Sequence, residues 1–271
     1  MNAALINGVP GERIDCTDRG LQYGDGLFET IRCQDGKPCW LDLHLQRLQR
    51  GLARLRIAFH QIDTLRGEIQ QLAASDRERC LVKVIVTRGS ATRRGYAPAG
   101  DETPTRVLSR HPWPTMRRAD EFRVGLSAVR LSANPLLAGL KHLNRLEQVM
   151  AQMACVEHGL SEVLMLSATP HVISGSMSNV FFAMKQQLVT PELGDAGVEG
   201  VMRQVVLNAS ASLNIEIQVR AVEPQELIDV REAFVTNVRL GVQSVHWLDG
   251  RTLVSHDYAQ QLRRHVDAST D

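Results

Sequence analysis

Lysine is scarce in this chain of 271 residues, because only four are present and the other 27 of the 31 Lys and Arg residues are arginine. A lysine amine can form a Schiff base with an aldehyde, whereas an arginine guanidinium cannot. Imine chemistry is therefore restricted to four positions, which are Lys37, Lys83, Lys141 and Lys185. A GC-rich genome would produce the same bias. The scarcity of lysine therefore limits the candidates for an imine-forming residue without assigning that role to any of them.

Features of membrane, secreted and nucleic-acid-binding proteins are also missing. No apolar run reaches the roughly 18 residues of a bilayer-spanning helix, and the first residues do not resemble a signal peptide. The formal net charge is only +1, which disfavours nucleic acid and anionic membranes as partners. The five cysteines form no CxxC pair and are typical of reduced thiols. We therefore expect a cytoplasmic protein without nucleic-acid or membrane partners.

The motifs of several common enzyme sites are absent as well. The chain has neither a GxxxxGK[ST] loop nor a GxGxxG loop, which disfavours the usual nucleotide sites. It lacks HExxH and CxxC, so no metal site is expected. It also lacks GxSxG, and "SGSMS" does not replace that serine-hydrolase elbow.

The pattern of apolar residues predicts an α+β protein with two domains, at residues 1–115 and 120–271. Pro112, Pro114 and the charged run "MRRADE" interrupt the pattern between them. Leucines at helical spacing predict a helix over 44–55, and Asp63 is a candidate N-cap for a helix over 63–74. "DRGLQYGDGLFETIR" predicts a glycine-punctuated loop that leads into a strand, "CQDGKPCW" a hairpin, and residues 143–157 a further helix.

Among the four lysines, Lys141 has the most apolar surroundings. Lys37 and Lys185 lie in predicted turns, and Lys83 lies in a predicted strand that we expect to expose it. Lys141 follows Leu140 inside the stretch "LLAGLKHL". A buried ammonium costs several kcal/mol unless it is paired or its pKa falls, and an amine of lowered pKa suits an aldehyde cofactor. An ion-paired or snorkelling lysine explains the pattern about equally well.

Two weaker patterns are compatible with phosphate binding. "DAGVEGVMRQ" opens a predicted helix with small residues, and free backbone N–H groups at such a helix start favour an anion. Arg47 lies on the polar side of the 44–55 helix, beside its leucine face. Many helices begin with glycine, and an ordinary surface arginine is the simpler interpretation of Arg47.

Nearly the whole chain resembles the aminodeoxychorismate lyases, which belong to the fold-type-IV pyridoxal-phosphate enzymes together with the branched-chain and D-amino acid aminotransferases. The matching segments occur in the order "DRGLQYGDGLFETIR", "HLQRL", "VTRG…RRGY", "LLAGLKHLNRLEQV", "SNVFF", "TPEL…GVEGVMR" and "FVTN". The "AGLKHLNRLEQV" stretch is closer to the lyases than to the aminotransferases.

The resemblance implies a D-amino acid aminotransferase-like fold of two α/β domains with pyridoxal 5'-phosphate between them. It also implies a homodimer whose partner subunit helps to close the substrate pocket. Lys141 would carry the cofactor and Arg47 would bind its phosphate. Further cofactor contacts would come from the backbone of Val198, Glu199, Asn237 and Val238 and from the side chain of Leu193.

The implied reaction converts 4-amino-4-deoxychorismate to 4-aminobenzoate and pyruvate, a step towards folate. Lys141 would act as the general base, and Thr30 would supply a hydroxyl in the pocket. The substrate carries carboxylates, so arginine partners are expected, and Arg94 and Tyr96 of "RRGY" are the candidates. Arg88 and Arg93 are rivals to Arg94, and a loop that only contacts solvent is the alternative.

One position departs from the family pattern. Most members carry a glutamate in the form V-x-E-x-x-x-x-N, which binds the protonated pyridine nitrogen, whereas "VISGSMSN" places Ser174 there. A serine hydroxyl favours the protonated nitrogen less than a carboxylate does, which weakens the electron sink. Ser174 therefore favours a lyase driven by aromatisation over an aminotransferase. An aminotransferase on the same fold, and a degenerate homologue that only binds a metabolite, remain alternatives.

Overall fold

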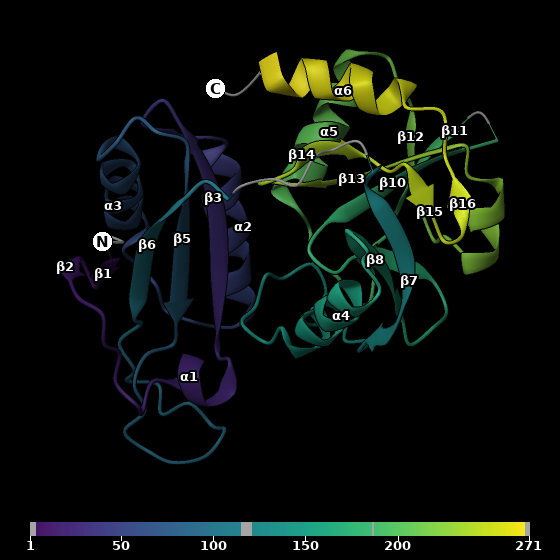
Figure 1. Ribbon diagram of the computed structural model, residues 1–271. Helices are drawn as coiled ribbons and strands as arrows, with labels where there is room; N and C mark the ends of the chain where they lie inside the picture. Colours follow the sequence, from purple (N-terminus) through teal and green to yellow (C-terminus); the bar gives the residue numbers. More distant parts are fainter. Residues whose placement is uncertain (1–3, 115–120, 186, 269–271) are drawn as a thin grey trace. The chain divides into compact units, whose positions relative to one another are not determined.

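The computed structural model describes residues 4–114, 121–185 and 187–268, which form two compact units (Figure 1). The first unit contains the residues up to 114 together with Leu140–Asn144. The second contains residues 121–139 and those from 145 onwards. Most of the linker predicted over 112–121 lies outside the described residues. Lys141, which the predicted division placed in the second domain, groups with the first unit because its segment pairs with a strand there.

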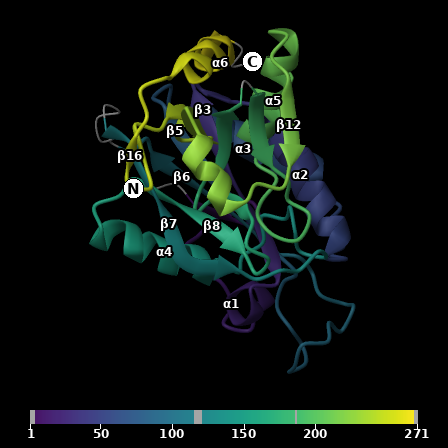
Figure 2. The same ribbon diagram turned by 90° about the vertical axis from the view of Figure 1, so that its right-hand side faces the viewer.

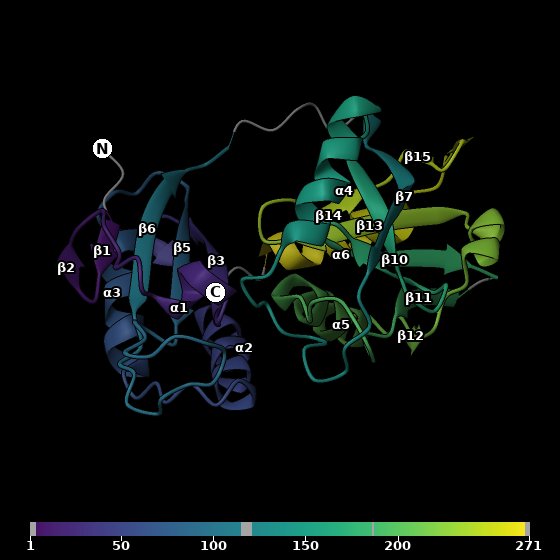
Figure 3. The same ribbon diagram turned by 90° about the horizontal axis from the view of Figure 1, so that it is seen from below.

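The first unit is built on one antiparallel sheet of six strands in the order β2-β1-β6-β5-β3-β4. Figures 1 and 3 show its two longer helices on the same face of that sheet. Apolar residues at every second position of β5, such as Val82, Val84 and Val86, are buried. The elements are β1 (Ala4–Ile6), β2 (Val9–Pro10), α1 (Arg19–Tyr23), β3 (Gly26–Gln34), β4 (Lys37–Pro38), α2 (Leu41–Arg54), α3 (Ile62–Ala74), β5 (Cys80–Thr87) and β6 (Arg106–Pro112).

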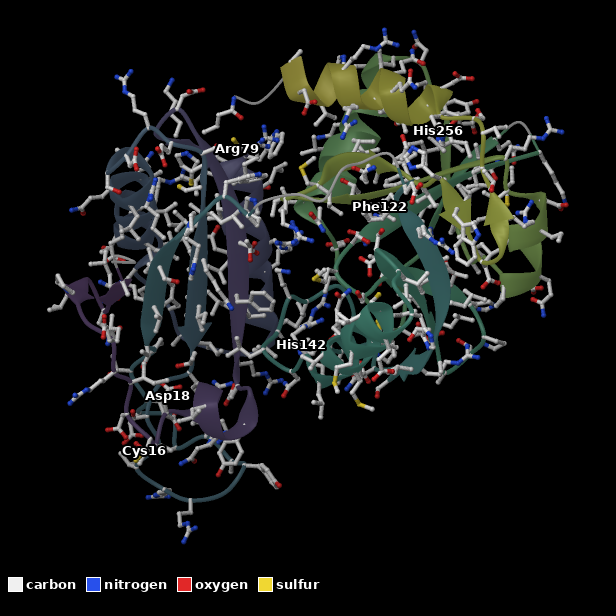
Figure 4. All side chains as sticks on the ribbon, viewed as in Figure 1. Cys16, Asp18, Arg79, Phe122, His142 and His256 are labelled. Carbon is white, nitrogen blue, oxygen red and sulfur yellow. The ribbon has the colours of Figure 1, made fainter. Side chains whose placement is uncertain are left out.

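Three local predictions for this unit need correction. The stretch predicted as a loop contains α1, whose N-cap Asp18 accepts a hydrogen bond from the Gly20 N–H at 2.8 Å (Figure 4). The helix predicted over 44–55 begins earlier, at Leu41. The N-cap of α3 is Gln61, so Asp63 lies in the first turn of the helix, where its charge still favours the helix dipole.

The second unit contains two five-stranded sheets, visible from another side in Figure 2. The strand orders are β12-β11-β10-β13-β14 and β16-β15-β7-β8-β9. The first sheet consists of β10 (Asn179–Met184), β11 (Gln187–Pro191), β12 (Ile217–Arg220), β13 (Glu232–Asn237) and β14 (Gly241–Ser244). The second consists of β7 (Arg123–Leu131), β8 (Glu162–Ser167), β9 (Val172–Gly175), β15 (Trp247–Leu248) and β16 (Arg251–Thr252).

Helices connect the parallel strands of the second unit. The parallel pair β7 and β8 is joined through α4 (Leu146–Glu157), and the parallel pair β11 and β12 through α5 (Val201–Ser212), as parallel pairing requires a long crossover. A 3₁₀ helix, η2 (Pro224–Asp229), and α6 (Asp257–Ala268) follow. The helix predicted from residue 143 begins at Leu146 instead, because the Leu143 N–H is donated to the carbonyl of Gly26 at 3.0 Å.

Candidate active site

The segment Leu140–Asn144 is held against the start of β3 by backbone hydrogen bonds on both sides of Lys141. The Phe28 N–H donates to the Lys141 carbonyl at 3.0 Å, and Leu27 and His142 form a β-bridge (His142 is labelled in Figure 4). Lys141 therefore has a backbone position set by a strand rather than by a mobile loop. Its Nζ lies 4.3 Å from the centroid of the Phe28 ring.

The surroundings of Lys141 differ from those that the sequence predicted. Leu140 is buried, but Leu136 is exposed and Lys141 itself is half-buried. The apolar contact comes instead from Phe28, more than 100 positions earlier in the chain. The other three lysines are exposed, as predicted, and Lys83 lies on β5 with its Nζ 5.5 Å from the same Phe28 ring.

A buried ion pair fixes Arg47 on α2. Its Nε donates to Glu29 Oε1 at 2.8 Å, and its NH2 group donates to Glu29 Oε2. His44 Nδ1 is 2.7 Å from the same carboxylate. Arg47 is therefore buried and is not an ordinary surface arginine. It lies beside the buried leucines of α2. Neither Glu29 nor His44 was predicted as a site residue, although both lie in the segments that carry the family resemblance.

The charges of this cluster are set by its burial. Burial alone would raise the pKa of Glu29, but Arg47 and hydrogen bonds from His44 and Arg47 lower it to about 2. Burial lowers the pKa of His44, and the nearby charges of Arg47 and Lys141 act in the same direction, while Glu29 opposes them. His44 is therefore neutral near pH 7, and the pair of Glu29 and Arg47 carries no net charge.

Thr30 lies on β3 two residues after Phe28, and its side chain therefore points to the same face of the sheet. It is half-buried and opposite Lys83 of β5 in the strand register. The first unit thus holds Lys141, Phe28 and Thr30 at one end of β3.

The loop of residues 88–105 carries the two predicted substrate-binding residues, and both Arg94 and Tyr96 are exposed. Buried Arg19 fixes the backbone there, because its guanidinium donates to the carbonyls of Gly95 and Tyr96 at 3.2 and 2.6 Å. The rival Arg88 is occupied by two hydrogen bonds to Asp25 and by the carbonyls of Leu55 and Arg56. Arg88 therefore has a structural role, which leaves Arg93 and Arg94 as candidates.

The start of α5 in the second unit presents free backbone amides, and one of the two predicted amides before it, that of Glu199, is engaged. The Glu199 N–H is donated to the Gly139 carbonyl at 3.0 Å, so this amide is occupied. Gly200 is the N-cap and makes no side-chain cap. Across the described residues, the N–H groups of Val201, Met202 and Arg203 have no acceptor, as expected in the first turn of a helix. The Val198 N–H also has no acceptor among the described residues, so it stays a candidate anion donor beside these three, whereas the Glu199 N–H is engaged.

Asn179 explains why glycine opens this helix. Its Nδ2 donates to the Val198 carbonyl at 3.0 Å, and a Cβ at position 200 would overlap its Oδ1. The "SN" and "GVEG" segments are therefore one structural unit. The side chain of Asn237, at the end of β13, is also engaged. Its Oδ1 accepts hydrogen bonds from the Arg239 and Leu240 N–H groups, and its Nδ2 donates to the Met177 carbonyl at 3.1 Å.

Two further predicted cofactor residues are half-buried. Val238 lies between β13 and β14, and Leu193 packs against a small core cluster of the second unit. A Cβ at Gly197 would lie 3.0 Å from Leu193 Cδ2, so Leu193 covers the turn that leads to α5.

Ser174 is buried on β9, and its hydroxyl donates to the Gly175 carbonyl at 2.8 Å. Its proton is thus engaged locally, so toward a ligand the oxygen acts as an acceptor. The buried carboxylate of Glu162, which was not predicted from the sequence, organises the turn that follows. It accepts hydrogen bonds from the N–H groups of Ser176 and Met177 and from the hydroxyls of Ser176 and Ser178.

The described residues contain no group of three or more His, Cys, Asp or Glu side chains that could hold a metal ion. Within the same ranges, no helix combines the length and the apolar character needed to cross a bilayer. In the first unit, the half-buried amine of Lys141 suits an aldehyde and buried Arg47 suits an anion. In the second unit, the free amides at the start of α5 suit an anion. The donors of each unit are of the kind that pyridoxal 5'-phosphate needs.

Comparisons with known proteins agree with this chemistry. The amino-transferase class IV family model matches residues 26–247. An aminodeoxychorismate lyase of Vibrio harveyi is 34% identical over 243 residues, which cover 89% of each chain. The crystal structure of 4-amino-4-deoxychorismate lyase from Pseudomonas aeruginosa matches with a TM-score of 0.93 and 36% identity over 99% of both chains. A D-alanine aminotransferase of Bacillus licheniformis is 29% identical over 259 residues, 93% of this chain and 90% of the relative.

These matches confirm the predicted fold type and the resemblance on which it was based. The family model spans well over half of the chain, and the similarity to the Pseudomonas structure extends over almost all of it. The chain belongs to the class IV aminotransferase family of fold-type-IV enzymes.

Proposed function

We propose that the protein is a pyridoxal 5'-phosphate-dependent lyase that converts 4-amino-4-deoxychorismate to 4-aminobenzoate and pyruvate. The observation that carries the proposal is the position of Lys141, the one lysine of the four that is not exposed, fixed on β3 over the Phe28 ring. All four lysines lie within the described ranges. The lyases of Vibrio and Pseudomonas at 34% and 36% identity support the choice of reaction.

The cofactor, when bound, supplies an electron sink that stabilises negative charge on the substrate carbon. The protein's residues bind, orient and move protons. Arg47 of the first unit and, in the second unit, the N–H groups of Val198, Val201, Met202 and Arg203 are the proposed donors for the phosphate. Lys141 Nζ holds the cofactor, then takes the proton from the substrate ring carbon and returns a proton to the departing pyruvate enol. Loss of that proton and of the enolpyruvyl group leaves an aromatic ring, which drives the elimination.

Thr30 is the proposed pocket hydroxyl, because it shares the sheet face of Phe28. The hydroxyl of Ser174 is the proposed acceptor toward the pyridine nitrogen. Leu193 would contact the cofactor, and the backbone at Asn237 and Val238 would complete the phosphate contacts. The Asn237 side chain is not available for this role because it caps its own turn.

The proposed assembly is a homodimer. The proposed compartment is the cytoplasm, since all five cysteines are free thiols. The main alternative is a D-amino acid or branched-chain aminotransferase, which the D-alanine aminotransferase relative at 29% identity keeps open. Ser174 favours the lyase, because a transaminase depends on a strong electron sink throughout its cycle.

Two assays on the purified protein test the function. The first follows 4-aminobenzoate and pyruvate released from 4-amino-4-deoxychorismate. The second supplies D-alanine or branched-chain amino acids with 2-oxoglutarate. We expect release of both products and slow or no transamination. Transamination at ordinary rates without lyase activity would refute the assignment, and a protein with no visible absorbance after incubation with the cofactor would be a degenerate homologue.

Replacing Ser174 by glutamate is expected to raise turnover several-fold, because a carboxylate holds the pyridine nitrogen protonated more strongly than a hydroxyl does. The control is Ser174→Gln, which has nearly the same size without the charge and should not raise turnover. Turnover is measured together with the amount of bound cofactor. A large fall in turnover for Ser174→Glu with the cofactor still bound would contradict the role assigned to Ser174.

Replacing Arg94 by alanine is expected to lower kcat/KM about 10- to 100-fold, mainly through KM, because a hydrogen bond between charged groups contributes about 1.5–3 kcal/mol. Arg93→Ala is the matched control, since the neighbouring side chain is equally exposed on the same loop. An unchanged kcat/KM for Arg94→Ala, with a loss for Arg93→Ala, would transfer the role to Arg93.

A further inference from the structure

The carboxylate of Glu162, at the start of β8, is the common hydrogen-bond acceptor of the turn between β9 and β10. Glu162 is 1% exposed, and a carboxylate at such a position is costly unless its oxygens are satisfied. Its Oε1 accepts from the Ser176 N–H at 3.0 Å and from the hydroxyl of the same residue. Its Oε2 accepts from the Met177 N–H at 3.2 Å and from the Ser178 hydroxyl at 2.8 Å. Every residue of the turn formed by 176–178 therefore donates to this one carboxylate.

Two residues near the 176–178 turn are adapted to the carboxylate. A Cβ on Gly175 would lie 2.9 Å from Glu162 Oε2 and 2.2 Å from the Ser178 Oγ, so glycine permits their close approach. Gln152 of α4 donates its Nε2 to Glu162 Oε1 at 3.3 Å. Apolar side chains would fill a buried site without the desolvation cost of a carboxylate. The reason for Glu162 is therefore to be found in the groups that the turn carries.

One peptide group connects Glu162 with Ser174. The N–H of the peptide between Gly175 and Ser176 donates to Glu162 Oε1 and is shared with the Val163 carbonyl at 3.1 Å. The carbonyl of the same peptide accepts the hydrogen bond from the Ser174 hydroxyl at 2.8 Å. A trans peptide is planar, with its N–H and C=O on opposite sides, so a fixed N–H also fixes the carbonyl. Glu162 thus helps to set the direction in which the Ser174 oxygen offers its lone pairs.

Two asparagines connect the same turn with the proposed phosphate contacts. Asn179 follows the turn directly, and its Nδ2 donates to the carbonyl of Val198, shortly before α5. Asn237, at the end of β13, donates its Nδ2 to the Met177 carbonyl. All of these residues belong to the second unit. A displaced turn would therefore move the proposed acceptor for the pyridine nitrogen and the proposed phosphate donors of this unit together.

We infer that Glu162 is a positioning residue for the cofactor. Through the 176–178 turn, it holds the Ser174 oxygen and the amides near α5 at fixed positions relative to each other. The inference rests on the proposed function and adds to it a residue that acts through the turn and not by contact with the cofactor. Misplacing a group by about 1 Å can lower the rate of an enzyme about 100-fold, so a residue of this kind affects catalysis from a distance.

Replacing Glu162 by glutamine tests the role, because the side chain keeps its size while one acceptor oxygen becomes an NH₂ group that faces the donors of the turn. We expect the dissociation constant of pyridoxal 5'-phosphate to rise about 10-fold in titrations of apoenzyme, and kcat for release of 4-aminobenzoate to fall about 10-fold. The KM for the substrate should change little, since the proposed substrate-binding residues lie in the first unit. The visible band of the bound cofactor should shift, because the group facing the pyridine nitrogen is displaced.

Glu232→Gln is the matched control for a loss of stability alone. Glu232 is also 1% exposed in the second unit, and it accepts from the N–H groups of Ala259 and Tyr258 at 2.7 and 3.2 Å. It lies at the start of β13, opposite Ala183, and holds the first turn of α6 instead of the 176–178 turn. Both variants should lower Tm, whereas only Glu162→Gln should alter cofactor affinity, kcat and the visible band.

Two further variants complete the test. In a Ser174→Ala background, Glu162→Gln should no longer shift the visible band, because effects that act through one residue are not additive. An equal shift in both backgrounds would overturn the action through Ser174. If Glu162→Gln does not fold, Ser178→Ala removes one donor to the carboxylate and should change cofactor affinity about 3-fold. Its control is Ser255→Ala, which removes a donor to Glu232.

The outcomes separate this role from the proposed function. Equal changes of cofactor affinity, kcat and visible band in Glu162→Gln and Glu232→Gln would overturn the positioning role, while release of both products by the wild type would leave the function intact. A wild type that binds the cofactor without releasing 4-aminobenzoate would overturn the function, and affinity and absorbance would still decide on Glu162. A wild type that binds no cofactor would overturn both.

Discussion

Replacing Lys141 by alanine is expected to lower the release of 4-aminobenzoate about 10³-fold or more, because the variant loses both the group that holds the cofactor and the proposed base. The protein should remain folded, since the backbone bonds that fix residues 140–144 do not involve the side chain. The visible absorbance band of the holoenzyme should disappear. Borohydride reduction of the wild type, followed by peptide mapping, should place the cofactor label on Lys141.

Lys83→Ala is the matched control for this experiment. Its Nζ lies 5.5 Å from the Phe28 centroid, compared with 4.3 Å for Lys141, so both amines are near the same ring. Lys83 is exposed, and its replacement should leave activity and absorbance almost unchanged. A label on Lys83, or activity that survives in Lys141→Ala, would show that the position on β3 does not select the reactive amine.

Replacing Arg47 by alanine is expected to weaken binding of pyridoxal 5'-phosphate about 100-fold, while binding of pyridoxal, which lacks the phosphate, should change little. The reason is the loss of a hydrogen bond between charged groups, which contributes about 1.5–3 kcal/mol. Cofactor affinity is measured by titration of apoenzyme with each compound. If both affinities fall by the same factor, Arg47 does not bind the phosphate.

The same change should also destabilise the fold, and a control is needed to separate the two effects. Without Arg47, Glu29 is a buried carboxylate that has lost its ion pair, which costs about 3–5 kcal/mol. Arg106→Ala removes a comparable partner, because Arg106 is buried and paired with Glu68 at 2.7 Å in the same unit. Arg106→Ala should lower Tm similarly without altering the ratio of the two affinities.

The pH dependence of stability follows from the pKa of Glu29. Its pKa is lowered from its ordinary value of 4.5 to about 2, so the folded state favours the ionised carboxylate. The pair with Arg47 therefore contributes its full stabilisation above about pH 4.5, and this contribution is lost as the pH falls towards 2. In Arg47→Ala the pKa of Glu29 should rise, because burial then acts with less opposition. Unfolding curves between pH 3 and 7 should show a smaller decline with acidification in the variant.

The sequence was sufficient for the elements with strong periodicity. The leucines of α2 and the alternating residues of β5 have one buried face each, and local spacing alone determines which face that is. Helix starts were less predictable. α2, α3 and α4 each begin at a residue other than the predicted one. For α4 the reason is a bond to distant backbone, that between Leu143 and Gly26.

The residues of the candidate site also divide into those that the sequence predicted and those that only the structure revealed. Lys141 and Arg47 could be proposed from residue type and resemblance, since each has few competitors in the chain. The partners that define their roles could not, because Phe28 precedes Lys141 by more than 100 positions and Glu29 precedes Arg47 by 18. The choice among the amides before α5 also required the structure, because Glu199 is identified as occupied only by its bond to Gly139.

By itself, the sequence determined the two-domain α+β character, the restriction of imine chemistry to four lysines and the family, because these depend on composition, local periodicity and ordered motifs. The tertiary structure alone decided which unit holds Lys141, which amides remain free at α5, and which carboxylate pairs with Arg47. The physical reason is that burial and hydrogen-bond satisfaction depend on groups that are distant in the chain, and local residue order does not specify which of these groups meet.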